Sequence, residues 1–542
     1  MTTEFDYIIV GGGTAGCILG ERLSADPSHR VLLLEAGRPN RNQLLLMPMT
    51  ARNFWTNPAY LWTYQSEPEP SVNQRRIPVP RGKILGGSGA INGMLYARGH
   101  PLDYDTWRQM GNDGWGYDDV LPYFKRIETD SHGPGPYHGG AGPLVISRTP
   151  DANSLTPLFL KAAEEAGIPA NDDQNGASPE GMGVPDLTID HGERASTYSA
   201  FLKPAMARPN LTILTHAQAL RLVIEKGRAI AVEYLHDGQR RMARAAREIV
   251  LSGGTYNSPQ LLLLSGIGPA DELRTLGIAP VVDLPGVGRN LQDHAGVSVV
   301  NHATEPVSLV NNLRYDRLAL SVLRWQVARG GAVGTMPVVM NGWYRSSPER
   351  EIPNIQTLIG ANSPFAGPWF PGIKKPAPHM FSSRSGLQHP ESRGYMTLAS
   401  ADPLSPPRIF FNLFSAPGDL AVLRFAIRKV REIFAATPVR HLMGAEVIPG
   451  PDLQSDADLD QFIRNTTTTA YHPVGTCAMG SVVDAELRVR GIAGLRVADA
   501  SIMPSITTGN TNAPTVMIGD KASDLILGQR LPRAELQQLA AE

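Results

Sequence analysis

The stretch Tyr7-Ile8-Ile9-Val10-Gly11-Gly12-Gly13-Thr14-Ala15-Gly16 joins a β-prone apolar run to three glycines spaced Gly-x-Gly-x-x-Gly. A helical pattern follows, and then a continuous apolar run from Val31 to Leu34. A glycine pattern within this order of strand, turn, helix and strand indicates dinucleotide binding. Gly11 permits the tight turn, Gly13 lets the backbone approach a pyrophosphate, and Gly16 lets the helix pack closely on the strand.

An acidic residue completes this pattern. Glu35 follows the second apolar run and lies 19 residues beyond Gly16, where a carboxylate can accept hydrogen bonds from ribose hydroxyls. The N-terminus of the intervening helix offers free N–H groups and the positive end of its dipole to phosphate. An ordinary glycine turn is the alternative interpretation, and the flanking strands, helix and acid weigh against it.

Composition narrows the class of protein. The 542 residues include 50 Lys and Arg against 51 Asp and Glu, a formal net charge of −1. This balance argues on electrostatic grounds against nucleic acid or an anionic membrane as the main partner. Apolar residues make up 42%, so the chain can build a core, and its length suggests three to four domains at roughly 150 residues each. Gly (54) and Pro (45) are well above average use, which indicates many loops and tight turns.

The sequence contains few signals that would assign the protein to a cellular compartment. The two cysteines, Cys17 and Cys477, exclude a disulfide framework and so imply no oxidising compartment. Glu4 and Asp6 precede the first apolar run and no basic region does, so no secretory signal is expected. No apolar stretch approaches the ~18 residues of a membrane-spanning helix. We expect a cytoplasmic protein, with peripheral association with the inner membrane left open.

Further motifs lie far from the first glycine turn. A second glycine cluster, Arg81-Gly-Lys-Ile-Leu-Gly-Gly-Ser-Gly-Ala-Ile-Asn92, would let backbone approach a ligand, although alone it could equally be a structural loop. Residues 206–253 are patterned like strands, and residues 419–435 have the apolar spacing of an amphipathic helix, which we interpret as core packing. Near the C-terminus, Tyr471-His472-Pro473 is followed by Asn512-Ala513-Pro514, which predicts the start of a helix running to about Leu527.

These segments together resemble the glucose-methanol-choline (GMC) flavoprotein oxidoreductases. The resemblance includes the first glycine motif with Glu35, the block from Gly82 to Asp105, and the run from Gly254 to Gly268. It also includes Gly286-Val-Gly-Arg-Asn-Leu-Gln-Asp-His294 and the two C-terminal motifs around His472 and Asn512. The motifs lie in the family's order and cover nearly the whole chain. The subgroup that looks most similar is the bacterial alcohol dehydrogenases and oxidases.

The resemblance implies an α/β fold with two domains. A discontinuous Rossmann-like FAD-binding domain is expected from residues 1–155, 195–300 and 465–542. A substrate-binding (cap) domain of α+β type, carrying an antiparallel sheet, is expected from residues 156–194 and 301–464. This organisation replaces the three or four domains that length alone suggests.

The resemblance also implies FAD as the cofactor, since the glycine motif by itself fits both FAD and NAD. Some relatives attach FAD through a histidine in the segment aligned with residues 88–92. Ile91 occupies that position here and cannot form the link, so FAD is expected to bind non-covalently. Cofactor contacts are expected from Gly11, Gly13, Thr14, Ala15, Gly16, Glu35, Ala36, Arg81, Gly86, Gly87, Ser88, Asn92, Gly93, Ala219, Gly253, Asp499, Ala500, Asn512, Pro514 and Thr515.

For activity, the resemblance implies oxidation of a primary alcohol to the aldehyde, by an oxidase or a dehydrogenase. This reaction removes an O–H proton and a hydride, and His472 is the natural base because imidazole titrates near neutral pH. In the family its position faces flavin N5, the hydride acceptor. Asn512 matches the second catalytic position, where its amide can hydrogen-bond the alcohol oxygen, although it could instead be a helix cap. His294 is expected to be structural.

Substrate identity is weakly encoded. Residues 311–381 are expected to line an apolar or aromatic-tolerant pocket with no carboxylate cluster for a cationic substrate. No metal site is expected, and the expected partners are a small-molecule alcohol and an oxygen or quinone-type electron acceptor. Candidate pocket residues are Met336, Met340, Trp343, Phe365, Trp369 and Tyr471.

The same fold hosts other functions. A hydroxynitrile lyase retains FAD but does no net redox chemistry. A fatty-acid photodecarboxylase is associated with a cysteine in the substrate domain, whereas Cys17 and Cys477 both lie in flavin-domain motifs. A non-catalytic flavin-binding protein is the third alternative, and the presence of His472 and Asn512 argues against it.

Overall fold

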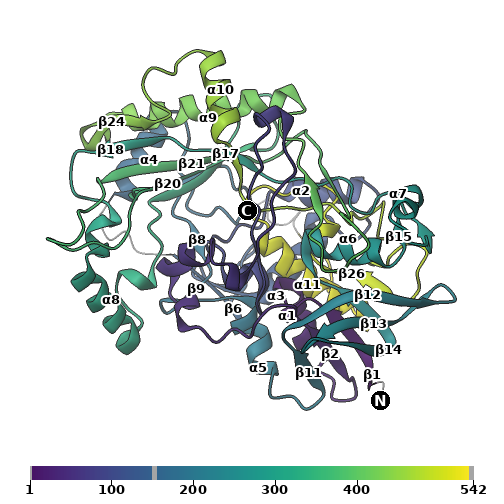
Figure 1. Cartoon of the computed structure of the whole chain (residues 1–542). Helices are drawn as coiled ribbons and strands as arrows, with labels where there is room; N and C mark the ends of the chain where they lie inside the picture. Colours follow the sequence, from purple (N-terminus) through teal and green to yellow (C-terminus); the bar gives the residue numbers. More distant parts are fainter. Residues whose placement is uncertain (1–2, 149–154, 536–542) are drawn as a thin grey trace.

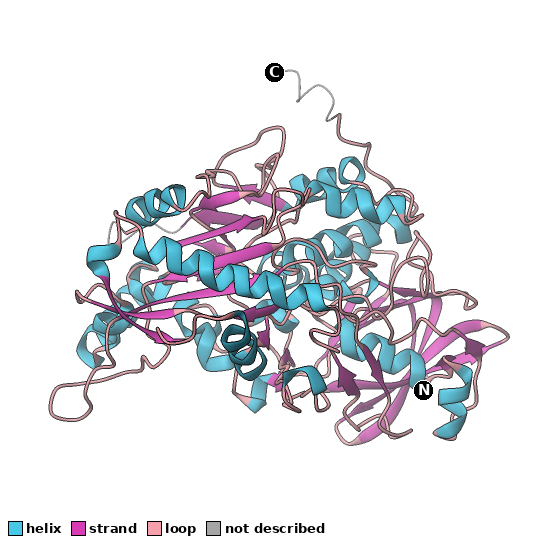
Figure 2. Cartoon of the chain, turned by 90° about the horizontal axis from the view of Figure 1, so that it is seen from above, coloured by secondary structure: helices cyan, strands magenta, loops and turns pink. Residues whose placement is uncertain are grey.

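Two seven-stranded sheets organise the computed structural model, which describes residues 3–148 and 155–535. The sheet that contains the N-terminal strand lies at the lower right of Figure 1, and the second sheet lies at the upper left. Helices lie between and around the sheets, as the view from above in Figure 2 also shows. The expected mixture of α and β structure with antiparallel pairing is confirmed.

The first sheet has the strand order β11-β2-β1-β14-β13-β12, with β26 paired to β14. Its parallel part consists of β1 (Thr3–Val10), β2 (Val31–Leu34), β11 (Leu211–Leu214), β14 (Gln239–Leu251) and β26 (Leu495–Val497). An antiparallel ribbon of β12 (Ala217–Glu225) and β13 (Arg228–His236) continues from β14. Val10 stands opposite both Leu34 and Leu251. The residues that follow these three strands therefore meet at one edge of the sheet.

Two helices from opposite ends of the chain pack together beside this sheet. α1 (Thr14–Leu23) follows β1 directly, and α11 (Asn512–Leu527) matches the helix that the sequence predicts near the C-terminus. A Cβ on Gly519 would lie 2.9 Å from the Cα of Ala15, so glycine is what lets α11 approach α1. The buried Asp520 of α11 pairs with Arg22 of α1 (3.2 Å) and with Arg126 (2.7 Å) of α3 (Tyr117–Ile127).

The second sheet is antiparallel. Its order is β19-β20-β21-β17-β25, with β18 paired to β21 and β24. The strands are β17 (Ala295–Val297), β18 (Val300–Ala303), β19 (Met340–Tyr344), β20 (Ile355–Gly360), β21 (Met380–Leu387), β24 (Met443–Ile448) and β25 (Thr468–Thr469). The helix α9 (Pro417–Ala435) packs on it, and the apolar stripe of α9 is buried, as the sequence predicts.

Shorter elements connect the two sheets. The remaining helices are α2 (Pro101–Gln109), α4 (Thr156–Glu165), α5 (Lys203–Ala205), α6 (Gly254–Leu264), α7 (Ala270–Thr275), α8 (Tyr315–Ala328) and α10 (Asp456–Thr466). The remaining strands are β3 (Leu61–Trp62), β4 (Arg81–Gly82), β5 (Glu128–Asp130), β6 (Leu144–Arg148), β7 (Gly181–Gly183), β8 (Asp186–Leu187), β9 (Ile189–Asp190), β10 (Glu193–Arg194), β15 (Ile267–Gly268), β16 (Val282–Asp283), β22 (Tyr395–Thr397) and β23 (Arg408–Phe410). Within residues 3–148 and 155–535, no helix combines the length and the apolar character needed to cross a bilayer.

Candidate active site

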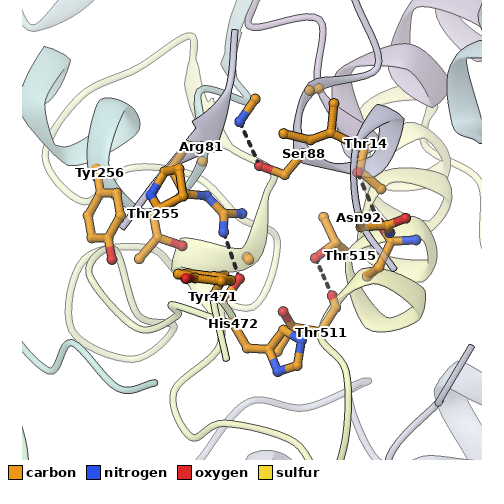
Figure 3. A pocket seen from close by; sticks show the side chains of 18 of the residues that line it. Thr14, Arg81, Ser88, Asn92, Thr255, Tyr256, Tyr471, His472, Thr511 and Thr515 are labelled. Carbon is orange, nitrogen blue, oxygen red and sulfur yellow. Dashed lines mark hydrogen bonds between the residues drawn. The ribbon is translucent and has the colours of Figure 1, made fainter. Parts of the chain in front are cut away.

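A cavity of about 760 Å³ extends from the edge of the first sheet to the face of the second. At one end it is lined by residues that follow β1, β2 and β14, among them Gly11, Glu35 and Ser252. At the other end it is lined by residues of β20 and β21. Figure 3 shows Thr14 and Ser88 on one side of the cavity, with Tyr471 and His472 facing them. The cavity therefore brings together the motifs that lie far apart in the sequence.

The first glycine turn has the backbone that its spacing predicts. Gly11 has φ of +106°, and a Cβ on it would lie 2.4 Å from the carbonyl oxygen of Ser252. A Cβ on Gly16 would lie 1.9 Å from the carbonyl oxygen of Gly11, so the helix can begin here only with glycine at this position. Gly13 lies between them and lines the cavity. Backbone, rather than side chain, therefore forms the cavity wall at the start of α1.

Two carboxylates line the same end of the cavity, and both accept backbone hydrogen bonds. Glu35 accepts from the N–H groups of Gly12 (2.8 Å) and Gly37 (2.7 Å). Asp499 accepts from the N–H groups of Gly254 (2.9 Å) and Ser501 (2.8 Å). Burial raises the pKa of Glu35 to about 7, although both backbone bonds oppose this. These donors supply the compensation that a carboxylate needs beside a phosphate-bearing ligand.

The second glycine cluster packs directly on the first. A Cβ on Gly87 would lie 2.7 Å from the Cα of Gly13, so the two backbones are in contact. Asn92, at the end of the cluster, accepts a hydrogen bond from Arg194 Nη1 (2.6 Å). Arg194 is buried and belongs to none of the motifs that the sequence shows. It holds the segment that contains Asn92 against the cavity.

Most of the residues expected to contact the cofactor line this cavity, and three do not. Gly16 lies beneath the turn, Gly86 packs against Ala90 and Tyr198, and Pro514 is buried in the first turn of α11. These three residues pack behind the residues that line the cavity and do not line it themselves. The expected residues that do line it are Gly11, Gly13, Thr14, Ala15, Glu35, Ala36, Arg81, Gly87, Ser88, Asn92, Gly93, Ala219, Gly253, Asp499, Ala500, Asn512 and Thr515.

Tertiary contacts hold the backbone of His472 in place. Its N–H donates to Asp293 Oδ1 (2.9 Å), and the carbonyl of Tyr471 accepts from Arg81 Nη1 (2.6 Å). Tyr471 itself has φ of +63°, a left-handed conformation that costs a non-glycine residue free energy. Such a conformation persists where the surroundings determine it, so the position of the imidazole is built into the fold.

Two hydrogen bonds orient the imidazole of His472. Its Nε2 lies 3.0 Å from Asn510 Nδ2, and its Nδ1 lies 3.0 Å from His294 Nδ1. Asn510 Oδ1 accepts from Gln356 Nε2 (3.3 Å), which assigns the NH₂ group of Asn510 to the side that faces His472. By the same assignment, Nε2 of His472 is the acceptor and Nδ1 carries the proton. The unprotonated nitrogen is therefore the one beside Asn510.

Electrostatics keep this imidazole neutral. Burial, and after it the charges of Arg81 and Arg384, lower the pKa of His472 to about 3. Burial also lowers the pKa of His294, which is 0% exposed. A neutral imidazole can accept a proton, which is the requirement for a general base.

The two asparagines of the C-terminal motif make different contacts in the structure. Asn512, the expected second catalytic residue, begins α11 and accepts a hydrogen bond from Thr14 Oγ1 (3.1 Å). Asn510, two residues earlier, is the one that contacts His472. Asn510 was not among the expected residues, because the run Gly509-Asn510-Thr511-Asn512 holds two asparagines two residues apart and only Asn512 matched the family's motif. Only the path of the backbone into α11 distinguishes them.

Comparison with known proteins identifies the family. Models of the GMC oxidoreductase N- and C-terminal regions match residues 5–296 and 390–519. The chain belongs to the GMC oxidoreductase family. An oxygen-dependent choline dehydrogenase of Sinorhizobium fredii is 43% identical over 533 residues, covering 97% of this chain and 96% of that protein.

Solved structures agree with this GMC assignment. The crystal structure of pyridoxine 4-oxidase from Mesorbium loti has a TM-score of 0.86 at 30% identity, covering 97% of this chain and all of that one. A formate oxidase from Aspergillus oryzae, in a study of FAD modification, has a TM-score of 0.90 at 28% identity, covering 97% and 98%. The family resemblance seen in the sequence is confirmed.

The substrate side of this GMC oxidoreductase differs from the expectation. Tyr471 and Met336 line the cavity, but Met340 and Trp343 are buried in the core of the second sheet. Phe365 is 60% exposed at the surface. Trp369 lies in the same surface segment, where its Nε1 donates to the carbonyl of Val310 (2.8 Å), because this segment packs beside the start of α8 rather than over the cavity.

The substrate side of the cavity is lined by residues of β20 and β21 instead of the residues that were expected there. Gln356 and Leu358 line the cavity from β20, and Arg384 and Gly386 line it from β21. Alternate residues of a strand face the same side of a sheet, which explains the spacing of two in each pair. This alternation is visible in the sequence, but the face that meets the cavity is not.

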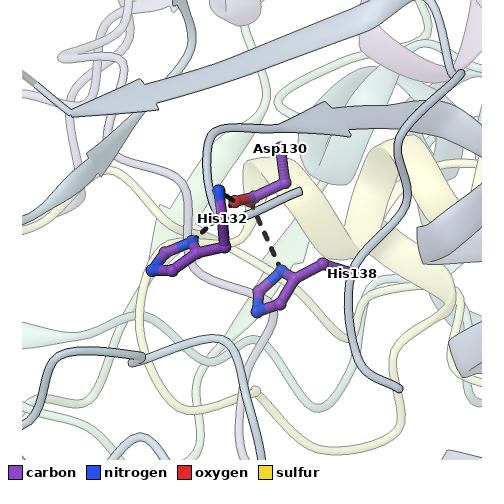
Figure 4. Close-up of side chains that lie close together, drawn as sticks. All are labelled: Asp130, His132 and His138. Atoms are coloured by element: carbon purple, nitrogen blue, oxygen red, sulfur yellow. Dashed lines mark hydrogen bonds and ion pairs between the residues drawn. The ribbon is translucent and has the colours of Figure 1, made fainter. Parts of the chain in front are cut away.

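A second cluster of titratable groups lies away from this cavity (Figure 4). Ligand atoms of Asp130, His132 and His138 lie within 4.8 Å of one another, a spacing that could hold a metal ion. Burial opposes charge on His138, but hydrogen bonds to Asp130, Asp173 and Glu128 outweigh it and raise the pKa of His138 to about 11. A protonated imidazole has no lone pair for a metal. The contacts therefore favour an ion-pair network that stabilises the fold.

Proposed function

We propose that this GMC oxidoreductase uses non-covalent FAD to oxidise a primary alcohol to the aldehyde, with His472 as the general base. One observation carries the proposal. The neutral imidazole of His472 lines the same cavity as the glycine turn and Glu35. Choline, named in its relatives, is itself a primary alcohol, so this reaction class agrees with theirs.

The residues at the first end of the cavity fit a flavin dinucleotide. Backbone at Gly13 and Gly87 and the N-terminus of α1 would hold a pyrophosphate, and Glu35 would accept from a ribose. Ile91, at the position where some relatives attach FAD, is aliphatic and offers no group for a covalent bond. When bound, FAD would supply the ring that accepts the hydride.

The chain's own groups would handle the proton. Nε2 of His472 would take the hydroxyl proton of the alcohol as the C–H bond breaks. The NH₂ group of Asn510, 3.0 Å from that nitrogen, would donate to the alcohol oxygen as negative charge develops on it. We retain Asn512 as a second contributor, because it lines the cavity at the positive end of α11.

For the domains, we propose a Rossmann-like FAD-binding unit of residues 1–155, 195–300 and 465–542. The substrate-binding unit would be residues 156–194 and 301–464. Every strand of the first sheet falls in the first set. In the second sheet, β17 and β25 lie a few residues outside the second set, so the sheet crosses the proposed boundaries where the two units meet.

Anaerobic reduction tests the proposal directly. Primary alcohols should bleach the flavin absorbance of the holoenzyme in the absence of oxygen. A hydroxynitrile lyase would leave the flavin oxidised. A photodecarboxylase would need light, and neither cysteine lines the cavity. Peroxide production in air, compared with reduction of a quinone-like dye, would identify the electron acceptor.

For localisation, we propose the cytoplasm with peripheral contact at the inner membrane through one face of α8. Leu320, Leu323 and Val327 are 47%, 60% and 81% exposed on this helix. Gathered apolar side chains of this size mark a partner or a membrane interface. Arg317 and Arg324 flank them and match anionic lipid headgroups.

Vesicle flotation tests this surface. The wild type should float with phosphatidylglycerol vesicles and should not float with phosphatidylcholine vesicles. The double variant Leu323→Glu/Val327→Glu should lose flotation and keep its activity, since neither residue lines the cavity. Equal flotation of the variant and the wild type would overturn the assignment of this face.

A further inference from the structure

Arg384 places an unpaired positive charge in the wall of the substrate side of the cavity. It lies on β21, beside the pair β17 and β25, and lines the cavity with His472. Only its Nη2 makes hydrogen bonds, to the carbonyl of Thr468 (3.0 Å), to Thr468 Oγ1 (2.7 Å) and to the carbonyl of Thr469 (3.3 Å). Among the described residues, nothing accepts a hydrogen bond from Nε or Nη1, and the buried Asp293 carboxylate acts on this arginine only through its charge, without a hydrogen bond.

The backbone leaves room for this guanidinium. A Cβ on Gly296 of β17 would lie 3.2 Å from Arg384 Nε and 3.3 Å from its Cζ. Gly296 lines the cavity as well, so a glycine stands where a side chain would press on the arginine. The carbonyl and hydroxyl contacts of Nη2 hold one side of the group, and two of its three nitrogens stay available to a ligand.

No negative charge in the lining balances Arg384. The carboxylates that line the cavity are Glu35 and Asp499, and both are engaged by backbone N–H groups at the dinucleotide end. A second cation, Arg81, also lines the cavity, and it donates a hydrogen bond to the neutral carbonyl of Tyr471. An unpaired charge removed from water is costly. A ligand of opposite charge would remove that cost.

Beyond Arg81 and Arg384, the only other charged side chain of the described residues that lines the cavity, besides Glu35 and Asp499, is Arg52, which is also a cation. Met336, Val338 and Leu358 contribute apolar surface, and Gln356 contributes an amide. This lining has no carboxylate that would attract an ammonium group, and Arg384 would repel one. A cationic alcohol is therefore opposed by charge at this site.

We propose that the preferred substrate is a primary alcohol that carries a carboxylate, and that Arg384 binds this carboxylate. The inference rests on the proposed function and names the substrate class for it. A free N–H of the guanidinium can donate a charge-assisted hydrogen bond to a carboxylate oxygen, and His472 in the same cavity meets the hydroxyl end. The hydroxy acid would become the corresponding aldehyde acid. Its hydroxyl proton would go to His472 and its hydride to FAD, so the carboxylate takes no part in the redox step.

Matched substrates test the proposal. The value of kcat/KM is measured for 4-hydroxybutanoate and 6-hydroxyhexanoate, for methyl 6-hydroxyhexanoate, for 1-hexanol and for choline. The value of kcat/KM should be about 10- to 100-fold higher for the two hydroxy acids than for the neutral ester, which is the range that a charge-assisted hydrogen bond supplies. Choline should be the poorest substrate. Equal rates for acid and ester, or a preference for choline, would overturn the proposal.

Variants of Arg384 show whether this residue is responsible. Arg384→Met should lose the preference for the acid, measured as the ratio of kcat/KM for 6-hydroxyhexanoate to kcat/KM for its methyl ester, and Arg384→Lys should keep part of this preference. Arg345→Met is the matched control, because Arg345 pairs with Glu180 (2.7 Å) and does not line the cavity. An equal loss with acid and hexanol would mean that Arg384 serves the cofactor or the fold, and would overturn the assignment.

A binding measurement covers the case in which a variant loses activity. Isothermal titration calorimetry of the oxidised holoenzyme with hexanoate should show binding. The affinity for hexanoate should be at least 10-fold weaker in Arg384→Met. Hexanoate that binds wild type and variant equally would contradict the proposal. Failure of every alcohol to bleach the flavin would instead refute the proposed function, so the two failures are distinguishable.

Discussion

His472 Nε2 lies 3.0 Å from Nδ2 of Asn510, while Asn512 is turned to Thr14. The amide that stands beside the proposed base therefore belongs to the first asparagine of the motif. An alcohol that binds here would replace Asn510 as the partner of this nitrogen, and the NH₂ group of Asn510 would then donate to the alcohol oxygen. Proton removal and stabilisation of the developing charge would then occur at one point of the cavity.

This geometry predicts unequal effects for the two asparagines. Asn510→Ala should lower the rate of flavin reduction about 10²-fold, because a donor to the developing alkoxide is lost. Asn512→Ala should lower it less and should weaken flavin retention instead, because Asn512 bonds to Thr14 at the start of α1. Anaerobic stopped-flow reduction with flavin-to-protein ratios measures both. A larger kinetic loss in Asn512→Ala would contradict the assignment.

Removal of the base should slow the oxidation of the alcohol without changing the binding of the flavin. His472→Ala should retain flavin and lose at least ~10² in the rate of flavin reduction by alcohol. Anaerobic reduction of the purified variant measures this loss, and its visible spectrum measures flavin content. Near-normal reduction would exclude His472 as the base.

The pH dependence of flavin reduction should be that of an enzyme whose base is a neutral imidazole at neutral pH. Because the pKa of His472 is lowered to about 3, the base stays unprotonated from pH 5 to 8 and loses activity only as the pH falls toward 3. The rate of reduction by 1-hexanol should therefore show no acidic limb near pH 6.5. Arg384→Met removes one of the charges that lower this pKa, so it should move the acidic limb upward, whereas Arg345→Met should not. An acidic limb near pH 6.5 in the wild type would count against this account.

Cofactor retention should depend on Asp499. Asp499→Ala removes the acceptor for the N–H groups of Gly254 and Ser501. Buried donors left without partners cost about 1–3 kcal/mol each, so the variant should unfold at a lower temperature and lose flavin on gel filtration. The matched control is Asp484→Ala, since Asp484 accepts from the backbone at Glu486 and does not line the cavity. Full flavin content in Asp499→Ala would contradict the proposed role.

The network around His138 predicts a pH dependence of stability. The pKa of His138 is about 11 in the folded protein and near 6.5 in an unfolded chain, so its contribution is complete below about pH 6.5 and falls as the pH rises toward 11. The free energy of unfolding lost in His138→Gln should therefore be larger at pH 6 than at pH 9, by up to about 3 kcal/mol. Urea unfolding at the two pH values measures the difference. A loss that grows with pH would contradict this sign.

By itself the sequence determined the features that depend on local spacing. The Gly11-x-Gly13-x-x-Gly16 turn, the first two strands, the strands within residues 206–253 and the helix that ends at Leu527 follow from propensity and periodicity, and the structure contains them. The family, and the expectation that His472 is the base, follow from motifs that stand in one order along the chain. These features need only neighbouring residues, or their order, to be recognised.

The tertiary structure alone decided which side chains meet in the cavity. A strand offers two faces, and only the packing of β20 and β21 turned Gln356 and Arg384 toward the substrate side while Met340 and Trp343 went into the core. The same holds for Asn510 and for the lowered pKa of His472. That pKa depends on burial and on two arginines that are distant in sequence. Desolvation and charge act through space, and the order of residues does not specify those distances until the chain has folded.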